Sequence, residues 1–429
     1  MCSHTSLPDF LGALLESSVV RTIYSICGAE ASLVGGVLRD ALLERHAADI
    51  DVVVSGDGGG IAERLAVALD ARLVHLGGER FASYRLVSAE RIVDLWDRRG
   101  QSLEDDLRRR DLTINSMALE LGSERLIDPF GGRRDIHEHR LKATTAKSFS
   151  EDPLRVLRLV RFRVSLDFDI EPKTLELARQ SASEISALAI ERIRTEVELL
   201  IRHPQRVEAV RLLSSLAISP SLWESANQPP VERDLCESLA RLESWSEEIG
   251  RSAADLAPEI DTYLTSMAVL FAAANPARAD GIAESQATEA VRESQLLTRR
   301  ERRLVERLVH LSSVPYSESE ARWFLHRWGD RWLDAIAVWG ACSEPAVGPG
   351  ERLRRLSRLA GLAREHGADI FEPAPLLTGD EVGQRLSIGP GPEVGRCLDA
   401  LRRLQIQGRM GTRDEALAFV DDRKTGEES

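Results

Sequence analysis

The sequence has little that would supply a covalent framework or a membrane anchor. Its five cysteines among 429 residues are scattered, with no CxxC pair, so neither a disulfide framework nor a zinc site is expected. No apolar run reaches the roughly 18 residues that a membrane-spanning helix needs. Residues 1–18 lack the basic lead-in and apolar stretch of a signal peptide. These absences predict a cytoplasmic protein without membrane contact.

Positive charge is outweighed by negative charge, with 56 lysines and arginines against 69 aspartates and glutamates. A net charge of −13 argues against a nucleic-acid partner, because binding to phosphates usually leaves a basic footprint. A basic surface confined to one part of the chain can still bind one end of an RNA, and the chain has arginine-rich stretches. Arginine heavily outnumbers lysine, which suits bidentate phosphate contacts, although a genomic composition bias would produce the same excess.

Apolar residues are plentiful at 43%, enough for several buried cores, and the length suggests two to four compact units. Residues 22–142 mix short β-type runs, such as 32–34 and 49–54, with helical patterns such as 37–44. From residue 149 onward the spacing is helical almost throughout. The sequence therefore predicts an α+β protein: a small α/β sheet domain followed by an all-helical remainder.

Two aspartates lie on the predicted strand 49–54. Residues i and i+2 of a strand point to the same face, so Asp49 and Asp51 project together. Such a pair can hold two Mg²⁺ ions about 3.5–4 Å apart, the arrangement used for nucleotidyl transfer, although this spacing alone is more often structural. Asp94 lies on another apolar strand and is a candidate third carboxylate. An edge position with an arginine partner is the alternative reading of Asp94.

A glycine turn precedes the aspartate strand. Gly35 and Gly36 separate the strand 32–34 from the helix 37–44. Glycine lets the backbone approach a ligand closely, and a helix N-terminus presents free N–H groups to an anion. Arg39 adds a charge-assisted contact to phosphate. Two glycines also form ordinary turns, but their place just ahead of the aspartates favours phosphate binding.

An arginine cluster follows at residues 108–111 (RRRD). Arg109 and Arg110 are candidates for clamping a triphosphate. Asp111 can accept hydrogen bonds from a ribose and so select ribonucleotides, and Asn115 adds an amide to the same segment. Without its context, a run of arginines is typical of a solvated helix face.

The first long helix of the helical region opens with a candidate base-reading pair. Ser150 is a candidate N-cap, and Pro153 falls in the first turn, where a missing N–H costs little. Asp152 and Arg155 are three residues apart and would share a helical face, with Arg158 further along. An aspartate accepts from the amino group of cytosine or adenine, and an arginine donates to ring acceptors. A surface ion pair is the alternative.

Taken together, these segments resemble the class II tRNA nucleotidyltransferase and bacterial poly(A) polymerase family, within the wider polymerase-β-like nucleotidyltransferases. The segment 35–40 (GGVLRD) with 49–51 (DID) is similar to the family motif that carries the metal ligands, and 109–111 (RRD) is similar to the motif that contacts the triphosphate and the ribose. The segment 128–132 (DPFGG) resembles the hinge before the neck, and 151–155 (EDPLR) resembles the amino-acid template that selects CTP and ATP. The segment 191–196 (ERIRTE) resembles the motif that steadies the neck helix.

The family also implies an architecture and partners. It implies a head at residues 1–142, then a helical neck at 143–215, body at 216–365 and tail at 366–429. Residues 371–420 resemble the tail that grips tRNA in many bacterial members. The implied partners are tRNA, CTP and, in members that complete the CCA end, ATP, with Mg²⁺ as a two-metal cofactor. These motifs do not set an oligomeric state.

One departure from the family pattern bears on the reaction. Members that add the whole CCA sequence carry a longer flexible segment between the strand matching Asp94 and the arginine motif. Here only residues 95–108 intervene, which resembles the deletion seen in members that add only the two cytidines. The hypothesis is therefore a CC-adding enzyme. Full CCA addition, A addition and poly(A) synthesis remain open, as does a non-catalytic RNA-binding protein, against which the intact motif residues argue.

Overall fold

The computed structural model describes residues 9–47, 49–76, 83–89, 91–98, 102–218, 222, 232–256, 259–274, 283–311, 313–342 and 347–426. The chain divides into two compact units, Met1–Gln205 and Arg206–Ser429. The finer division into head, neck, body and tail stays a prediction. Among the helices so described, none combines the length and apolar character needed to cross a membrane.

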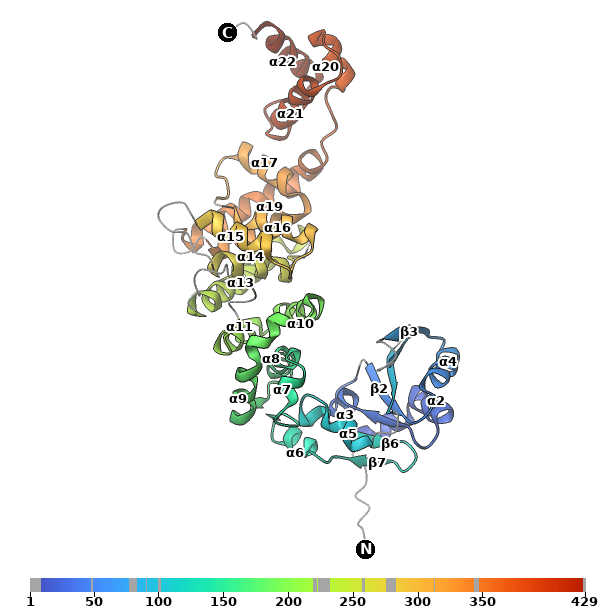
Figure 1. Ribbon diagram of the computed structural model, residues 1–429. Helices are drawn as coiled ribbons and strands as arrows, with labels where there is room; N and C mark the ends of the chain where they lie inside the picture. The colour runs from blue at the N-terminus through green and yellow to red at the C-terminus, as the bar shows by residue number, and fades with distance from the viewer. Residues whose placement is uncertain are drawn as a thin grey trace. The chain divides into compact units, whose positions relative to one another are not determined.

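The first unit contains a mixed seven-stranded sheet with the strand order β3-β4-β5-β2-β1-β6-β7 (Figure 1). Strand β2 pairs in parallel with β5 and antiparallel with β1, so it lies in the interior of the sheet. Its residues Ile50, Val52, Val53 and Val54 are buried, as expected for an interior strand. The strands are β1 (Ser32–Val34), β2 (Asp49–Val54), β3 (Arg72–Leu76), β4 (Ser83–Val87), β5 (Ile92–Asp97), β6 (Ala118–Glu120) and β7 (Arg125–Ile127).

Helices cover the sheet and supply the turns that carry the motifs. Helix α4 packs against α2 and against strands β3, β4 and β5 (Figure 1). Helix α5 begins after Ser102, whose hydroxyl caps the helix by accepting from the Asp105 N–H. These helices are α1 (Asp9–Glu16), α2 (Ser18–Cys27), α3 (Gly36–Leu42), α4 (Gly58–Ala68), α5 (Leu103–Arg108) and α6 (Gly132–His137), with the 3₁₀ turn η1 (Thr113–Asn115).

The helical part of the first unit departs from the prediction at its first long helix and at the short strand β9 (Asp169–Ile170). Asp152 has extended backbone dihedrals (φ −149°, ψ 97°) and separates two helices, because the residue before a proline is disfavoured in the helical region. The predicted Ser150 cap is wrong, since Ser150 lies inside the preceding helix. The elements here are α7 (Ser148–Glu151), α8 (Leu154–Leu166), α9 (Pro172–Ser181), η2 (Ala182–Ala187), α10 (Ile190–Arg202) and the parallel pair β8 (Arg140–Leu141) and β9 (Asp169–Ile170).

The second unit is helical in all the parts that the structure describes. Helices α14 and α18 are buried along nearly their whole length and pack against α13 and α16. The helices are α11 (Arg206–Ser215), α13 (Glu232–Ala253), α14 (Thr262–Ala274), α15 (Ala283–Glu293), α16 (Arg299–Val309), α17 (Glu318–Trp328), α18 (Trp332–Cys342), α19 (Pro349–Phe371), α20 (Gly379–Leu386), α21 (Pro392–Ile406) and α22 (Arg413–Gly426), with the 3₁₀ turns η3 (Ala254–Leu256) and η4 (Gly329–Arg331).

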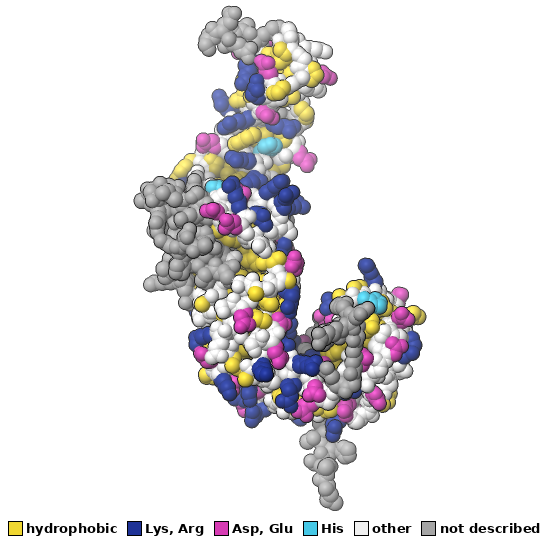
Figure 2. All heavy atoms as spheres, in the orientation of Figure 1, with side chains coloured by type: hydrophobic (Ala, Val, Ile, Leu, Met, Phe, Trp, Pro, Cys, Tyr) yellow, Lys and Arg dark blue, Asp and Glu magenta, His cyan; other side chains and the backbone are white. Residues whose placement is uncertain are grey.

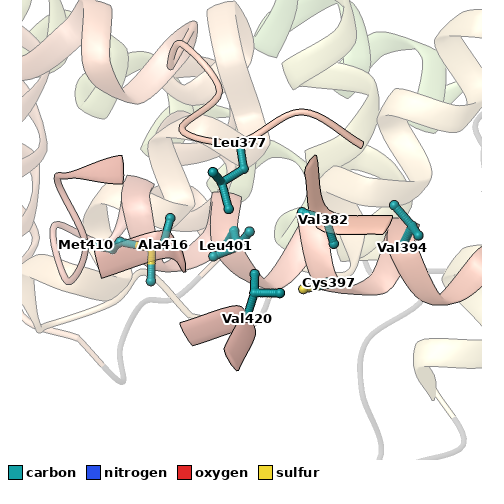
Figure 3. Close-up of a cluster of buried hydrophobic side chains, with 8 residues drawn as sticks. All are labelled: Leu377, Val382, Val394, Cys397, Leu401, Met410, Ala416 and Val420. Atoms are coloured by element: carbon teal, nitrogen blue, oxygen red, sulfur yellow. The ribbon is translucent and has the colours of Figure 1, made fainter. Parts of the chain in front are cut away.

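The last three helices share a small apolar core of their own. Val382 of α20, Leu401 of α21 and Val420 of α22 point toward one another and are buried (Figure 3). Helix α20 begins with a capping box, in which Thr378 and Glu381 satisfy each other's backbone N–H groups. This core holds the C-terminal helices together as one packed group.

Candidate active site

A pocket of about 510 Å³ lies within the first unit. It is formed by β2, the start of α3, the segment around η1, and helices α8 and α10. It brings together every predicted site residue except Gly35 and Asp94. Its lining is Gly36, Val37, Arg39, Asp40, Asp49, Asp51, Arg109, Arg110, Asp111, Asn115, Asp152, Leu154, Arg155, Arg158, Arg161, Phe162 and Arg192.

Two carboxylates on β2 provide the cation-binding side of the pocket. Asp49 is exposed, and Asp51 is partly buried on the same face of the strand. Burial raises the pKa of Asp51 to about 6, and the charges of Asp94 and Asp49 add to the rise while Arg110 opposes it. A pair of carboxylates is a donor set that Mg²⁺ uses together with substrate phosphates and water. The two aspartates therefore fit a divalent cation. Within the described residues, no larger group of acidic, histidine or cysteine side chains converges as a metal site.

Asp94 lies beside this pair but faces a different partner. It is opposite Asp51 in the parallel register of β2 and β5. Its two carboxylate oxygens accept from Nε and Nη2 of Arg85, both at 2.8 Å. This bidentate ion pair matches the arginine partner of the alternative reading of Asp94, but the edge position of that reading is wrong, because β5 lies between β4 and β2. Asp94 does not line the pocket.

Gly35 lies where a side chain would collide with charged groups of the site. Its φ of 77° lies in the left-handed region, which favours glycine. A Cβ atom at this position would lie 2.5 Å from Nη1 of Arg110 and 2.9 Å from Oδ2 of Asp51. Arg110 is further held by Asp106 at 3.2 Å and lies over the ring of Trp96. The glycine turn thus makes room for the arginine that faces the β2 carboxylates.

Arg39 is fixed by hydrogen bonds on one side of the pocket. Its Nε donates to Asp40 Oδ1 and its Nη1 donates to Asn115 Oδ1, each at 2.8 Å. The guanidinium also lies 5.1 Å from the centre of the Phe162 ring. Arg158 and Arg161 lie over the same ring, at 5.5 and 4.8 Å. Phe162 therefore supports three of the positive groups that converge on the pocket.

Asp111 is the most strongly held charge of the site. Its Oδ1 accepts from the Leu112 N–H and from Asn115 Nδ2, and its Oδ2 accepts from Arg158 at 2.7–2.8 Å. Burial alone would raise the pKa of Asp111, but the charge of Arg158 and these hydrogen bonds lower it to about 2. Asp111 thus positions Arg158 and Asn115, and its own oxygens are already engaged.

The predicted base-reading pair does not share a helical face. Asp152 lies in the extended break before α8, and its Oδ2 accepts from Nη2 of Arg192 at 2.8 Å. Arg155, in the first turn of α8, donates to the carbonyls of Ser148 and Arg109. Both side chains still line the pocket, and α10 supplies the partner of Asp152.

Positive charge dominates the pocket. Seven arginines and five aspartates line it, and Asp152, Asp111 and Asp40 each have an arginine partner. This balance suits an anionic ligand such as a triphosphate beside a cation on the β2 carboxylates. Sequence reasoning missed Asp40, Arg161, Phe162 and Arg192 as lining residues. The helical spacing of Arg158, Arg161 and Phe162 could have indicated that these side chains lie on one face of the first long helix. Nothing in the local sequence indicated the contact of Arg192 with Asp152.

Two protein-family models and several known proteins match the sequence of this chain. The poly A polymerase head domain model matches residues 31–142, and the model for the probable RNA and SrmB-binding site of polymerase A matches residues 167–223. The A-adding tRNA nucleotidyltransferase of Deinococcus radiodurans is 31% identical over 91% of this chain and 94% of its own length. The CC-adding tRNA nucleotidyltransferase of Geobacter sulfurreducens is 30% identical over 96% of each chain.

Solved structures share the fold. A CCA-adding enzyme in complex with CTP superposes with a TM-score of 0.71 at 22% identity, covering 98% of this chain and 97% of its own. The Thermotoga maritima CCA-adding enzyme in complex with tRNA gives a TM-score of 0.66 at 22% identity, with 96% and 97% coverage. The predicted α+β architecture, with a sheet-containing head and a helical remainder, is confirmed. The chain belongs to the tRNA nucleotidyltransferase family, and it is an enzyme of the nucleotidyltransferase class.

Proposed function

We propose that this enzyme adds cytidines from CTP to the 3′ end of tRNA without a nucleic-acid template, and that it stops after the second cytidine. The observation that carries the proposal is the pocket itself, whose lining combines the two carboxylates of β2 with seven arginines and with Asp152. The relatives named as tRNA nucleotidyltransferases support the tRNA substrate. The four-part division into head, neck, body and tail belongs to the same proposal.

In the proposed reaction, the 3′ hydroxyl oxygen of the tRNA attacks the α-phosphorus of CTP. The bond from the α-phosphorus to the bridging oxygen breaks, and pyrophosphate and the hydroxyl proton are released. The N–H groups at the start of α3 and the guanidinium groups of Arg39, Arg109 and Arg110 would bind the triphosphate. Arg110 is already held between Asp106 and Asp51, so its charge is positioned before the nucleotide binds.

Asp49 and Asp51 are the residues that would hold Mg²⁺. A bound pair of ions would lower the pKa of the attacking hydroxyl and neutralise the triphosphate. We leave Asp94 out of this ligand set, because Arg85 occupies both of its oxygens. Asp94 instead adds negative charge next to Asp51.

Base and sugar selection would come from side chains on and around α8. Asp152 can accept from the amino group of cytosine, and Arg155 can donate to the ring acceptors. Arg192 fixes the orientation of Asp152 through its 2.8 Å hydrogen bond. Asp111 would act on the ribose through Asn115 and Arg158, which it holds in place.

The restriction to cytidine rests on the short connection before α5. Strand β5 ends at Asp97 and α5 begins at Leu103, so five residues, 98–102, connect them, of which 99–101 lie outside the described residues. Helix α5 is in turn tied to the sheet, because Asp106 accepts from Trp96 Nε1 at 2.9 Å. A connection this short and anchored supports the hypothesis that the flexible segment of full CCA-adding members is missing.

A second candidate is A addition to tRNA that already ends in two cytidines. The specific observation in its favour is the 31% identity with the A-adding enzyme of Deinococcus radiodurans over most of both chains. Full CCA addition, which ATP would complete, and poly(A) synthesis are the remaining alternatives in the family. A non-catalytic RNA-binding protein is disfavoured by the intact carboxylates and arginines of the pocket.

The test uses three tRNA transcripts, one lacking the CCA end, one ending at the first cytidine and one ending at the second. Each is incubated with Mg²⁺ and with CTP, ATP or both. CC addition predicts that the first two transcripts gain cytidine up to the second position and that none gains adenosine. Addition of adenosine to the third transcript alone would establish the A-adding alternative, and completion of CCA on all three would overturn the subtype.

A further inference from the structure

Arg110 lies in the pocket against one of the β2 carboxylates, with its Nη1 4.0 Å from Asp51 Oδ2. At that distance the two groups attract each other without a hydrogen bond, so an unrestrained guanidinium could close onto Asp51. Lys and Arg side chains are also interspersed with Asp and Glu side chains over the face of the first unit that Figure 2 shows. Specific contacts are therefore needed to fix the direction in which the Arg110 guanidinium points.

Asp106, on α5, provides the first of these contacts. Its Oδ2 accepts from Nε and Nη2 of Arg110, at 3.3 and 3.2 Å. Both distances are at the long end for N–H···O hydrogen bonds. Both donors also share one oxygen, so this is not the parallel two-oxygen pairing that gives an arginine its geometric precision. Asp106 alone therefore leaves the plane of the guanidinium loosely defined.

Trp96, on β5, provides the second contact and also holds the first in place. Its Nε1 donates to Asp106 Oδ1 at 2.9 Å, and the other oxygen of that carboxylate is the one that Arg110 contacts. The Arg110 guanidinium carbon lies 5.3 Å from the centre of the Trp96 ring, which is within the range of a cation–π contact. Tryptophan is the most favourable ring for this contact. One side chain thus acts on Arg110 both directly and through Asp106.

The strand pairing places the Trp96 ring beside the site. Residues i and i+2 share a face of a strand, so Trp96 lies on the same face of β5 as Asp94, which is opposite Asp51 of β2. Trp96 itself is opposite Val53, two residues along β2 from Asp51. The ring is partly buried and packs against the core cluster that contains Val53 and Leu107. Packing of this kind restricts the movement of the ring, which makes it a firm support for a charged group.

We propose that Trp96 is a positioning residue for the triphosphate of the incoming nucleotide: it holds Arg110, directly and through Asp106, so that Nη1 is presented to a phosphate oxygen. The inference rests on the proposed function for the identity of the ligand. In the part of the chain that the structure describes, Nη1 of Arg110 takes part in no hydrogen bond, so its N–H groups are available to an anion. A guanidinium that is already in place needs no reorganisation when the phosphate arrives. Trp96 does not itself line the pocket.

Packing alone is the alternative role of Trp96. A partly buried ring contributes to stability, and its removal would then weaken all activities of the first unit to a similar extent. Positioning through Arg110 predicts a selective effect instead. Phosphate binding should weaken, affinity for tRNA should not change, and the effect should vanish once Arg110 has been replaced.

The first test measures binding of pyrophosphate with Mg²⁺ to the full-length protein by calorimetry, because this probe has the phosphates without the base or the sugar. Trp96→Leu should bind it about tenfold more weakly than wild type, a loss of the size of a desolvated cation–π contact. Trp96→Phe keeps a ring but loses the Nε1–H donor, so we expect an intermediate loss of about threefold.

Tyr84→Leu is the matched control. Tyr84 is a partly buried aromatic residue on the neighbouring strand β4. It is opposite Leu95, whereas Ser83 is opposite Trp96, so Tyr84 lies on the other face of the sheet from Trp96. Urea unfolding identifies conditions in which every variant is folded. Under those conditions Tyr84→Leu should bind pyrophosphate within twofold of wild type.

A double-mutant cycle tests whether the effect passes through Arg110. In the Arg110→Gln background, Trp96→Leu should change the pyrophosphate affinity by less than twofold, because the group that Trp96 positions is absent. In addition assays, Trp96→Leu alone should raise KM for CTP about tenfold and leave KM for tRNA within twofold.

Equal pyrophosphate affinity of wild type and Trp96→Leu would overturn the inference. A tenfold loss that persists in the Arg110→Gln background would also overturn it, because Trp96 would then act through packing. Failure of the proposed function would show differently, as absence of nucleotide addition by the wild-type protein on every transcript, whatever its affinity for pyrophosphate.

Discussion

Replacing Gly35 with alanine should have two effects, strain in the backbone and displacement of side chains in the pocket, and a control variant can separate them. Gly35 has a φ of 77° and a ψ of −136°, a region that costs an L-residue about 1–3 kcal/mol. The added Cβ would also lie 2.5 Å from Arg110 Nη1 and 2.9 Å from Asp51 Oδ2, so both groups must move. Arg110 is the flexible member of the pair, and we expect its guanidinium to be displaced from the β2 carboxylates.

Gly28 provides a matched control in the same unit. Its φ of 75° carries a similar strain on substitution, but a Cβ there would meet no atom within 4 Å. Gly28→Ala and Gly35→Ala should therefore lose comparable stability, about 1–3 kcal/mol, in urea unfolding. Only Gly35→Ala should lose turnover, by about 10²–10³-fold, the usual effect of removing one preorganised contact to a developing charge.

The assay is cytidine incorporation into tRNA at saturating CTP, measured with both variants and wild type at a temperature where all are folded. Equal activity of the two variants would refute the argument that the Gly35 turn is shaped by Arg110 and Asp51. If the loss of activity followed the loss of stability in both variants, Gly35 would act only as an ordinary turn residue.

Three further predictions concern individual carboxylates. Asp152→Ala should lower the preference for CTP over UTP and ATP by about tenfold in kcat/KM, because the base edge loses its acceptor; an equal loss with every nucleotide would count against base reading. Asp94→Asn should cost less than about tenfold in activity, because Arg85 already neutralises Asp94 outside the pocket; a loss as large as that of Asp51→Asn would restore Asp94 as a metal ligand. The pKa of Asp111 is lowered to about 2, so its ion pair contributes about 2 kcal/mol above pH 4 and progressively less as the pH falls toward 2. The gap in urea midpoint between wild type and Asp111→Asn should narrow below pH 4, and a gap independent of pH would contradict the assignment.

The strands that carry the chemistry could be predicted because their signals are local. Residues 49–54 and 32–34 are β-branched or apolar runs, and both form the predicted strands β2 and β1. Strand β6 was not predicted, since Ala118, Leu119 and Glu120 have no β preference. Its pairing with β1 imposes the strand, which is a tertiary effect that a single sequence does not display.

Helix α6 is a second element that the sequence alone does not indicate. Its sequence, GRRDIH, is too polar to indicate a packed helix, yet Asp135 is fully buried. Asp135 accepts from Thr113 Oγ1 at 2.7 Å and from Arg140, so the burial is satisfied by residues from two other segments. A polar helix of this kind can be recognised only when its partners are known.

The site could be predicted as a set of residues but not as a set of contacts. The motifs identified most of the side chains that line the pocket, because each motif places its chemistry at a fixed spacing. The contact of Asp152 with Arg192 spans 40 residues and the contact of Asp94 with Arg85 joins neighbouring strands. Such pairings are set by the fold, which is why the sequence left the role of Asp94 open and the partner of Asp152 unnamed.

The most direct test of the central claim is single-turnover addition of cytidine to a tRNA lacking its CCA end, with wild type and Asp51→Asn. The isosteric change removes the charge of the β2 carboxylate without altering its size. We expect wild type to add two cytidines, and Asp51→Asn to be at least about 10³-fold slower while binding the tRNA with unchanged Kd. Turnover of Asp51→Asn above a tenth of the wild-type rate would contradict the account, because the pocket on β2 would then not be where the nucleotide is transferred.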